Sequence, residues 1–193
     1  YVKLRLICSK IFLFHLGDEA GIVDHSQIYD DCEYVWRFFC TNKYFKKKNL
    51  SCLPIGYKSG ISLTNKKSNN KYKCNFIGTP HKSSRHDLLF QLSEIKPSFI
   101  FKTKKFNDKK ILRADQMSEV LSSTTFVPCP NGFVHPETYR LYEALECNSI
   151  PIIESSFKYY DRLFPNNPLL KIDKWLDAKK IIAYWDNEQI DKK

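Results

Sequence analysis

The sequence predicts an α/β protein with a parallel sheet in the second part of the 193-residue chain. After residue 73, short apolar runs of strand length alternate with segments whose apolar residues recur at helical spacing. Turns rich in Gly, Pro and Asn separate these runs. Strands joined by crossover helices form right-handed parallel sheets, which bind ligands at the carboxyl ends of their strands. We therefore expect a Rossmann-like domain over residues 74–172.

Local patterns predict each element of this domain. We expect strands at 72–77, 98–102, 124–128 and 150–153, and helices at 85–95, 114–121, 136–147 and 175–184. Ser83 or Ser84 can cap the first of these helices. Pro136 suits the first turn of the third, because its ring fixes the backbone angle that a helix start needs. The last helix places residues 173–193 in a C-terminal helical segment.

The first 55 residues predict a smaller α/β segment made of short strands and polar turns. Strands are expected at 2–8, 11–15, 34–40 and 50–55. Arg37 has aromatic neighbours in its strand, so we expect it at the edge of a cleft or with its head in solvent. Residues 59–73 are rich in Ser, Asn, Lys and Gly, which predicts a linker or long loop over 56–73.

The formal charge of +10 suggests nucleic-acid binding, but the type of basic residue favours another explanation. Only six of the 31 basic residues are arginine, the residue that base and phosphate recognition favours. The lysines cluster in tracts at 46–48, 66–67, 104–105 and 109–110, beside Asn-rich loops. No run of about 18 apolar residues occurs. The chain begins with Tyr1 and carries no leader pattern, so we expect a fragment or a processed form.

The cysteines and histidines suggest no metal site. Seven cysteines form no CxxC pair, which argues against a zinc ribbon or a thioredoxin-type site. Cys32 and Cys40 can form a disulfide in an oxidising compartment. The five histidines lack metal-ligand spacing, and we expect structural or surface roles for His15, His25, His81, His86 and His135.

The stretch 126–154 has the strongest functional pattern. A strand ends in a glycine turn, and the amides and dipole of the helix that follows can bind an anion. Arg140 lies one turn into this helix and could bind a diphosphate, while Glu143 lies on nearly the same face and could accept ribose hydroxyls. The alternative is an exposed salt-bridge ladder formed by Glu137, Arg140 and Glu143.

Four segments of the chain carry a resemblance to exostosin-like glycosyltransferases of the two-domain GT-B fold. The donor-binding helix there is similar to Glu137-x-x-Arg140-x-x-Glu143-Ala144-Leu145 followed by Ile150-Pro151-Ile152-Ile153. The start of the C-terminal domain is similar to Phe76-Ile77-Gly78-Thr79 followed by Arg85. The crossing between domains is similar to Leu53-Pro54-Ile55-Gly56-Tyr57, and the end of the N-terminal domain to His15-Leu16-Gly17-Asp18-Glu19. This order most resembles the ribitol xylosyltransferase branch, over about residues 12–175.

The resemblance implies a glycosyltransferase, which we expect to be inverting, that moves a sugar such as xylose from a UDP-sugar to a glycan or polyol-phosphate acceptor. It implies a nucleotide-sugar-binding domain at 74–172, with residues 1–55 as the end, or a reduced form, of an acceptor-side domain. It implies no specific nucleic acid, and contact with a membrane only through an anchor outside this chain. The location would be the Golgi lumen in a eukaryote or the cytoplasm in a bacterium or virus.

The resemblance also implies roles for particular residues. The donor site would consist of Gly78, Thr79, Arg85, Gly132, Glu137, Arg140 and Glu143. Arg85 and Arg140 would neutralise the diphosphate, Glu143 would hold the ribose, and Glu137 would orient Arg140 or touch the sugar. Asp18 or Glu19 would be the general base, and the alternative for this acidic pair is an ordinary strand-to-loop turn.

Three departures from the family pattern keep other readings open. His135 stands eight residues before Glu143, where many GT-B enzymes have a second glutamate. No DxD occurs, which argues against the metal-bridged GT-A fold but leaves room for Mg²⁺ or Mn²⁺. About fifty residues are few for a whole acceptor domain. The alternatives are a basic nucleic-acid-binding protein and a non-catalytic glycosyltransferase-like protein.

Overall fold

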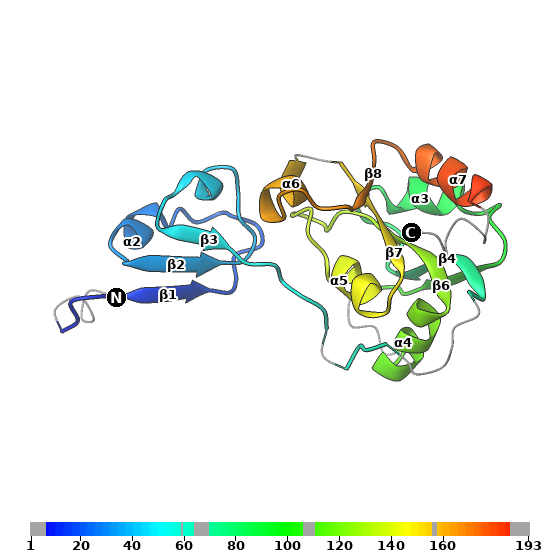
Figure 1. Cartoon of the computed structure of the whole chain (residues 1–193), viewed down its shortest axis with the longest axis horizontal. Coiled ribbons are helices and arrows are strands. Elements are labelled where there is room, and N and C mark those ends of the chain that lie inside the picture. The colour runs from blue at the N-terminus through cyan, green and yellow to red at the C-terminus, as the bar shows by residue number, and fades with distance from the viewer. Residues whose placement is uncertain (1–6, 59, 64–69, 106–110, 156–157, 186–193) are drawn as a thin grey trace. The chain divides into compact units, whose positions relative to one another are not determined.

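The computed structural model describes residues 7–58, 60–63, 70–105, 111–155 and 158–185. The chain divides into two compact units, of which the first comprises Tyr1–Ile55 and Tyr159–Asn167. The second comprises Gly56–Lys158 and Pro168–Lys193. Each unit contains one parallel sheet with helices between its strands (Figure 1), so the predicted α/β class with a Rossmann-like domain is confirmed. The strand expected at 2–8 lies mostly outside the described residues.

Unit 1 contains a three-stranded parallel sheet of order β1-β2-β3. Its strands are Phe12–His15, Tyr34–Arg37 and Leu50–Cys52, and its connections contain α2 (Ser26–Asp30) and the 3₁₀ helix η1 (Tyr44–Lys46). Side chains alternate across the sheet because successive strand residues point to opposite faces. Val35 is buried on one face against Tyr29 and Tyr44. On the other face the rings of Phe14 and Trp36 stack with centroids 4.7 Å apart.

A disulfide joins Cys40 to Cys52, so the Cys32–Cys40 bridge that the sequence allowed is not present. Cys52 ends β3 and lies opposite Arg37 of β2 in the sheet register. The chain turns back just after Arg37, and this brings Cys40 to a Cα–Cα distance of 5.8 Å from Cys52. Cys32 is instead buried, and its thiol donates to the carbonyl of Ile28.

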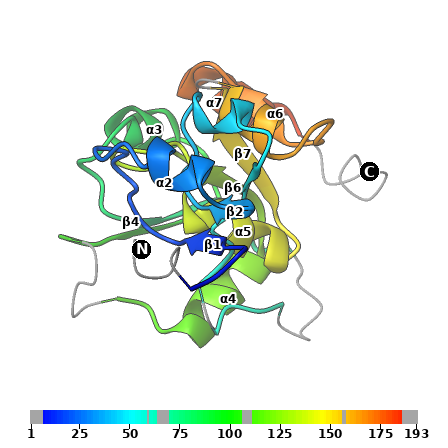
Figure 2. The same cartoon turned by 90° about the vertical axis from the view of Figure 1, so that its left-hand side faces the viewer.

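Unit 2 contains a five-stranded parallel sheet of order β5-β4-β6-β7-β8. The strands are β4 (Tyr72–Gly78), β5 (Ser98–Lys102), β6 (Thr124–Cys129), β7 (Ile150–Glu154) and β8 (Leu170–Ile172). The helices are α3 (Arg85–Gln91), α4 (Ala114–Ser122), α5 (Tyr139–Glu146) and α7 (Trp175–Tyr184). Figures 1 and 2 show α3 and α7 on one side of this sheet and α4 on the other. Every residue of β6 is buried, as expected for a central strand covered on both faces.

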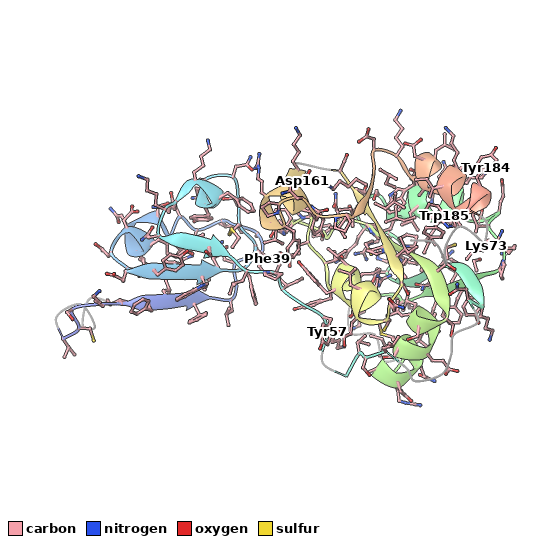
Figure 3. The ribbon with its side chains drawn as sticks, in the orientation of Figure 1. Phe39, Tyr57, Lys73, Asp161, Tyr184 and Trp185 are labelled. Carbon is pink, nitrogen blue, oxygen red and sulfur yellow. A yellow bond between two sulfur atoms is a disulfide. The ribbon has the colours of Figure 1, made fainter. Side chains whose placement is uncertain are left out.

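A core cluster of unit 2 lies between the sheet and the helix pair α3 and α7. Phe76 of β4, Leu88 of α3 and Trp175 of α7 are fully or almost fully buried in it. Trp185 follows α7 and packs edge-on against Phe126 with ring centroids 5.5 Å apart, whereas Tyr184 is exposed (Figure 3). This packing fixes α3, and therefore the loop that connects it to β4.

Two helices of unit 2 have different bounds from those predicted. α3 ends at Gln91 rather than at residue 95. α5 begins at Tyr139, because Thr138 is extended, with φ −138° and ψ 152°. Pro136 therefore lies in the loop before α5 and not in its first turn, which corrects the prediction. The short strand β8 was not predicted.

Residues 159–167 return to unit 1, although the sequence suggested that they belong with the Rossmann-like domain. They include α6 (Tyr159–Leu163). The ring of Tyr159 packs edge-on against Phe45, with centroids 5.7 Å apart. The Arg162 guanidinium bonds to the Asn42 amide and lies over the Phe45 ring. α6 is thus part of the unit 1 fold.

The surface of the described residues bears on the charge and membrane predictions. Lys104 and Lys105 are exposed, whereas the tracts at 66–67 and 109–110 lie outside the described residues. Within the described ranges, none of the helices combines the length and the apolar character that crossing a membrane requires.

Candidate anion-binding site

Two arginines meet at the carboxyl end of β4. Gly78 is the last residue of this strand and has a φ of +149°. A Cβ at this position would lie 3.4 Å from Nη2 of Arg140 and 4.0 Å from Nη1 of Arg85. Arg85 is the first residue of α3, and Arg140 is the second residue of α5. Both guanidinium groups therefore lie close to the end of the strand, within van der Waals distance of a Cβ at position 78.

The hydrogen-bonding capacity of the two guanidinium groups is only partly used. Nη1 of Arg85 donates to the carbonyl oxygen of Thr79 at 3.2 Å, and the Arg140 guanidinium lies 5.5 Å from the centroid of the Phe76 ring. Within the described part of the chain, the buried Nε of Arg85 and the buried Nη1 of Arg140 have no acceptor. Buried donors without acceptors are costly, so this arrangement favours a ligand that brings acceptor oxygens.

The electrostatics of the pair also favour an anion. Burial, and next the charge of Arg140, lower the pKa of Arg85 to about 10. The carboxylate of Glu154, at the end of β7, acts in the opposite direction on Arg85. An anion between the two arginines would relieve their mutual repulsion and restore the ordinary preference of Arg85 for its charged form.

The loop between β6 and α5 is anchored beside this pair. The backbone N–H of Asn131 donates to the Glu154 carboxylate at 2.8 Å. The side chain of Thr138 makes no capping bond to α5, and its buried hydroxyl has no partner among the described residues. The first amides of α5 are therefore not occupied by Thr138, and Gly132 lies in the loop that leads to them. Sequence reasoning missed Glu154, although a charged residue that ends a buried strand is a recognisable signal.

Glu137 and Glu143 are both buried, so an exposed salt-bridge ladder of Glu137, Arg140 and Glu143 is ruled out. Glu143 is almost fully buried, and burial raises the pKa of its carboxyl, against the opposing charges of Arg140 and Lys58. The buried Glu137 carboxylate accepts a hydrogen bond from the Tyr142 hydroxyl. Glu143 therefore shares the electrostatic environment of Arg140, and Glu137 supports the start of α5.

Thr79 is the remaining predicted residue of this region. Its side chain is buried, and its hydroxyl lies 3.3 Å from that of Thr103, beyond the end of β5. The structure thus brings together Gly78, Thr79, Arg85 and Arg140 at one edge of the sheet. This is the edge where parallel α/β sheets bind their ligands.

The predicted general bases lie in unit 1, where Asp18 is one member of a polar cluster. Arg37 is completely buried and donates from Nη2 to Oδ2 of Asp18 at 2.8 Å, and from Nη1 to Nδ1 of His15 at 3.0 Å. The hydrogen bond from Arg37 lowers the pKa of Asp18. Arg37 lies opposite His15 in the register of β1 and β2, so the cluster sits at the carboxyl edge of the sheet. Arg37 is therefore neither at a cleft edge nor snorkelling, which corrects the prediction.

The acidic stretch also has the geometry of a turn. The N–H of Gly21 donates to the carbonyl of Asp18 at 3.1 Å, and Glu19 between them is exposed. Asp18 has a φ of +61°. The acidic stretch therefore forms a strand-to-loop turn, in which Asp18 pairs with Arg37 and Glu19 is exposed to solvent.

Two histidines complete the unit 1 cluster, which their spacing in the sequence did not reveal. His15, Asp18 and His25 each place one ligand atom within 4.8 Å of the others. Two imidazoles suit zinc-like ions better than Mg²⁺ or Mn²⁺, which prefer oxygen ligands. Arg37 already donates to both Asp18 and Nδ1 of His15. This trio is therefore a poor match for the predicted Mg²⁺ or Mn²⁺.

The fold and the arginine pair of unit 2 define an α/β domain suited to binding an anionic ligand at the carboxyl edge of a parallel sheet. Residues 57–183 match the family model of the RXYLT1 C-terminal domain, and the chain belongs to this family. The match confirms the predicted resemblance to the C-terminal branch of the ribitol xylosyltransferases, and the family is related to glycosyltransferases. A comparison with curated proteins found no match.

Proposed function

We propose that this chain is a glycosyltransferase whose unit 2 binds a UDP-sugar by its diphosphate. The observation that carries the proposal is the pairing of Arg85 and Arg140 beside Gly78, each with a buried N–H group that lacks an acceptor among the described residues. Diphosphate oxygens would supply those acceptors and the missing negative charge. The family assignment supports the class of reaction.

The chemistry of glycosyl transfer explains the need for two arginines. The oxygen of an acceptor hydroxyl attacks the anomeric carbon of the sugar while the bond from that carbon to the phosphate oxygen breaks. The bonding electrons stay on the departing diphosphate, and the hydroxyl proton passes to a base. Because negative charge builds up on the diphosphate, fixed positive groups beside it lower the barrier. An attack opposite to the leaving group inverts the anomeric carbon.

The acidic residues near α5 have supporting roles in this proposal. Glu143 would accept hydrogen bonds from the ribose hydroxyls, and its charge would be favoured once those donors arrive. Glu137 would position Arg140 indirectly, through the bond that it accepts from Tyr142. Backbone amides at Gly78, Thr79 and Gly132 would complete the diphosphate contacts. A divalent cation, Mg²⁺ or Mn²⁺, would accompany the diphosphate if transfer requires one.

The family indicates which substrates to test first. Xylose is the proposed sugar, and a glycan or polyol phosphate is the proposed acceptor. Asp18 and Glu19 remain the predicted general bases. The ion pair with Arg37 holds Asp18 in its ionised form but makes it a weak base, whereas Glu19 is exposed to solvent.

Calorimetric titration with UDP and UDP-xylose tests the proposal. Arg140→Ala should weaken UDP binding by about tenfold or more, since a charge-assisted hydrogen bond contributes roughly 1.5–3 kcal/mol. Arg113→Ala is the matched control, because Arg113 is exposed and paired with Asp115. Absence of UDP binding in the folded protein would refute the proposal. Binding without transfer to any acceptor would favour the non-catalytic alternative, and salt-sensitive binding of duplex DNA alone would favour the nucleic-acid alternative.

A further inference from the structure

The loop between β6 and α5, which leads to Arg140, exposes a large aromatic ring. Phe133 is 70% exposed, and the neighbouring Val134 is 55% exposed. Single exposed apolar residues are common on protein surfaces, so the meaning of this ring depends on the loops that hold it. This ring belongs to the edge of the unit 2 sheet where β4 and β6 end.

One contact involves the Phe133 ring itself, and a second anchors the loop that carries it. The ammonium of Lys82 lies 4.7 Å from the ring centroid, and Lys82 precedes Arg85 by three residues in the β4–α3 loop. The N–H of Asn131, two residues before Phe133, is bonded to Glu154, whose charge acts on Arg85. The ring therefore belongs to, and contacts, the two loops that lead into the helices of Arg85 and Arg140.

We propose that Phe133 is a stacking platform for the nucleobase of the donor, an inference that rests on the proposed function. Lys82, Arg85 and Arg140 give this edge a positive charge, which matches a diphosphate. The exposed ring matches the π-face of a base, since aromatic side chains commonly stack on nucleobases. A nucleoside diphosphate carries both a diphosphate for the positive charges and a base for the aromatic ring. Phe133 would thus select nucleotides over other polyanions.

The proposal separates the base from the phosphates, so calorimetry with two probes tests it. UDP carries a base, whereas inorganic pyrophosphate carries only the charges that the arginines contact. Phe133→Ala should weaken UDP binding by roughly tenfold and leave pyrophosphate binding unchanged. Phe133→Tyr should keep the wild-type affinity for UDP, because it restores the stacking ring.

Phe90→Ala is the matched control, since Phe90 on α3 is also 70% exposed. It should bind both probes as the wild type does. Equal UDP affinity in Phe133→Ala and the wild type would overturn the stacking proposal, and so would an equal loss of both probes. Wild-type protein that binds pyrophosphate but shows no preference for UDP would overturn it as well. Wild-type protein that binds neither probe would instead overturn the proposed function itself.

Discussion

Gly78 and Arg140 approach so closely that a methyl group on residue 78 would lie 3.4 Å from Nη2 of the arginine. The contact joins the end of β4 to the start of α5, two elements separated by about sixty residues of sequence. The guanidinium of Arg140 thus packs against the backbone at the end of β4. The affinity of the site for UDP should therefore depend on the backbone conformation of Gly78.

Gly78→Ala should both destabilise unit 2 and weaken UDP binding. The φ of +149° is strained for an alanine, which costs roughly 1 kcal/mol or more, and relief of this strain would shift the strand end against which the Arg140 guanidinium lies. Thermal unfolding and UDP titration measure the two effects. Gly17→Ala is the control, because a Cβ there meets no atom within 4 Å. A Gly78→Ala variant with wild-type stability and wild-type affinity for UDP would contradict this explanation.

Glu143→Gln should stabilise the protein at neutral pH. Burial raises the pKa of Glu143, so the folded state favours the protonated carboxyl. The stability that this group contributes is complete below the unfolded pKa of a glutamate and is lost as the pH rises through the folded value. The gain from glutamine should therefore be largest near pH 7 and shrink toward pH 4, as followed by melting temperature. Glu146→Gln on the same helix is the control, because Glu146 is only half-buried. An equal gain at pH 7 and pH 4 in Glu143→Gln would refute the explanation.

Asp18→Asn should destabilise unit 1 by roughly 3 kcal/mol, because it leaves the buried Arg37 without its counter-ion. The lowered pKa of Asp18 means that its contribution is present at neutral pH and lost as the pH falls through the folded value, below 3.8. Chemical denaturation at pH 7 and pH 3 measures this difference. Glu19→Gln should leave stability unchanged, since Glu19 is exposed. Loss of transfer in Asp18→Asn at wild-type stability would instead assign Asp18 to catalysis.

Reduction of the Cys40–Cys52 disulfide should destabilise unit 1 by roughly 3 kcal/mol, through the greater entropy of the unfolded chain. Denaturation of the Cys40→Ala/Cys52→Ala double variant measures this cost, with Cys8→Ala as the control at an exposed free thiol. Unchanged stability in the double variant would show that the bridge is dispensable.

Alkylation of the native oxidised protein followed by mass spectrometry should modify Cys8 alone among the described cysteines. The other free thiols are buried, and burial raises the pKa of Cys74 to about 12, so its reactive thiolate is scarce. Rapid labelling of Cys74 in the folded state would contradict its place in the core.

Four of the five strands of unit 2, β4 to β7, were predictable because each depends on a local apolar run between clear turn signals, whereas the three-residue strand β8 was not predicted. The candidate site residues Gly78, Arg85 and Arg140 were also accessible from sequence, since Gly78 ends a strand and the two arginines lie in the first turns of helices that follow strands. The sequence pattern could not show that the Arg85 and Arg140 guanidinium groups lie beside Gly78 with N–H groups that lack hydrogen-bond acceptors among the described residues. That depends on the order of β4 and β6 in the sheet, which is a non-local property.

The errors have the same origin. The pairing of Cys40 with Cys52, and the cluster of His15, Asp18 and Arg37, both follow from the register of unit 1 strands, which no spacing in the sequence encodes. Pro136 was assigned to a helix because proline suits a first turn, but the extended backbone at Thr138 delays the helix start. Glu143 is buried because of the way in which α5 packs on the sheet. Helical spacing alone does not tell whether the face that carries Glu143 points toward the sheet or toward solvent.

The return of α6 to unit 1 has a consequence for synthesis on the ribosome. Residues up to Ile55 emerge early, but the segment that covers Phe45 follows only after about a hundred further residues. Unit 1 therefore completes its packing only when most of unit 2 is already translated, and until then Phe45 lacks the ring of Tyr159. A fragment that begins at residue 57 would carry α6 without Phe45. Tyr159 would then be exposed and could promote aggregation. Soluble expression should accordingly favour fragments that keep both pieces of unit 1 together.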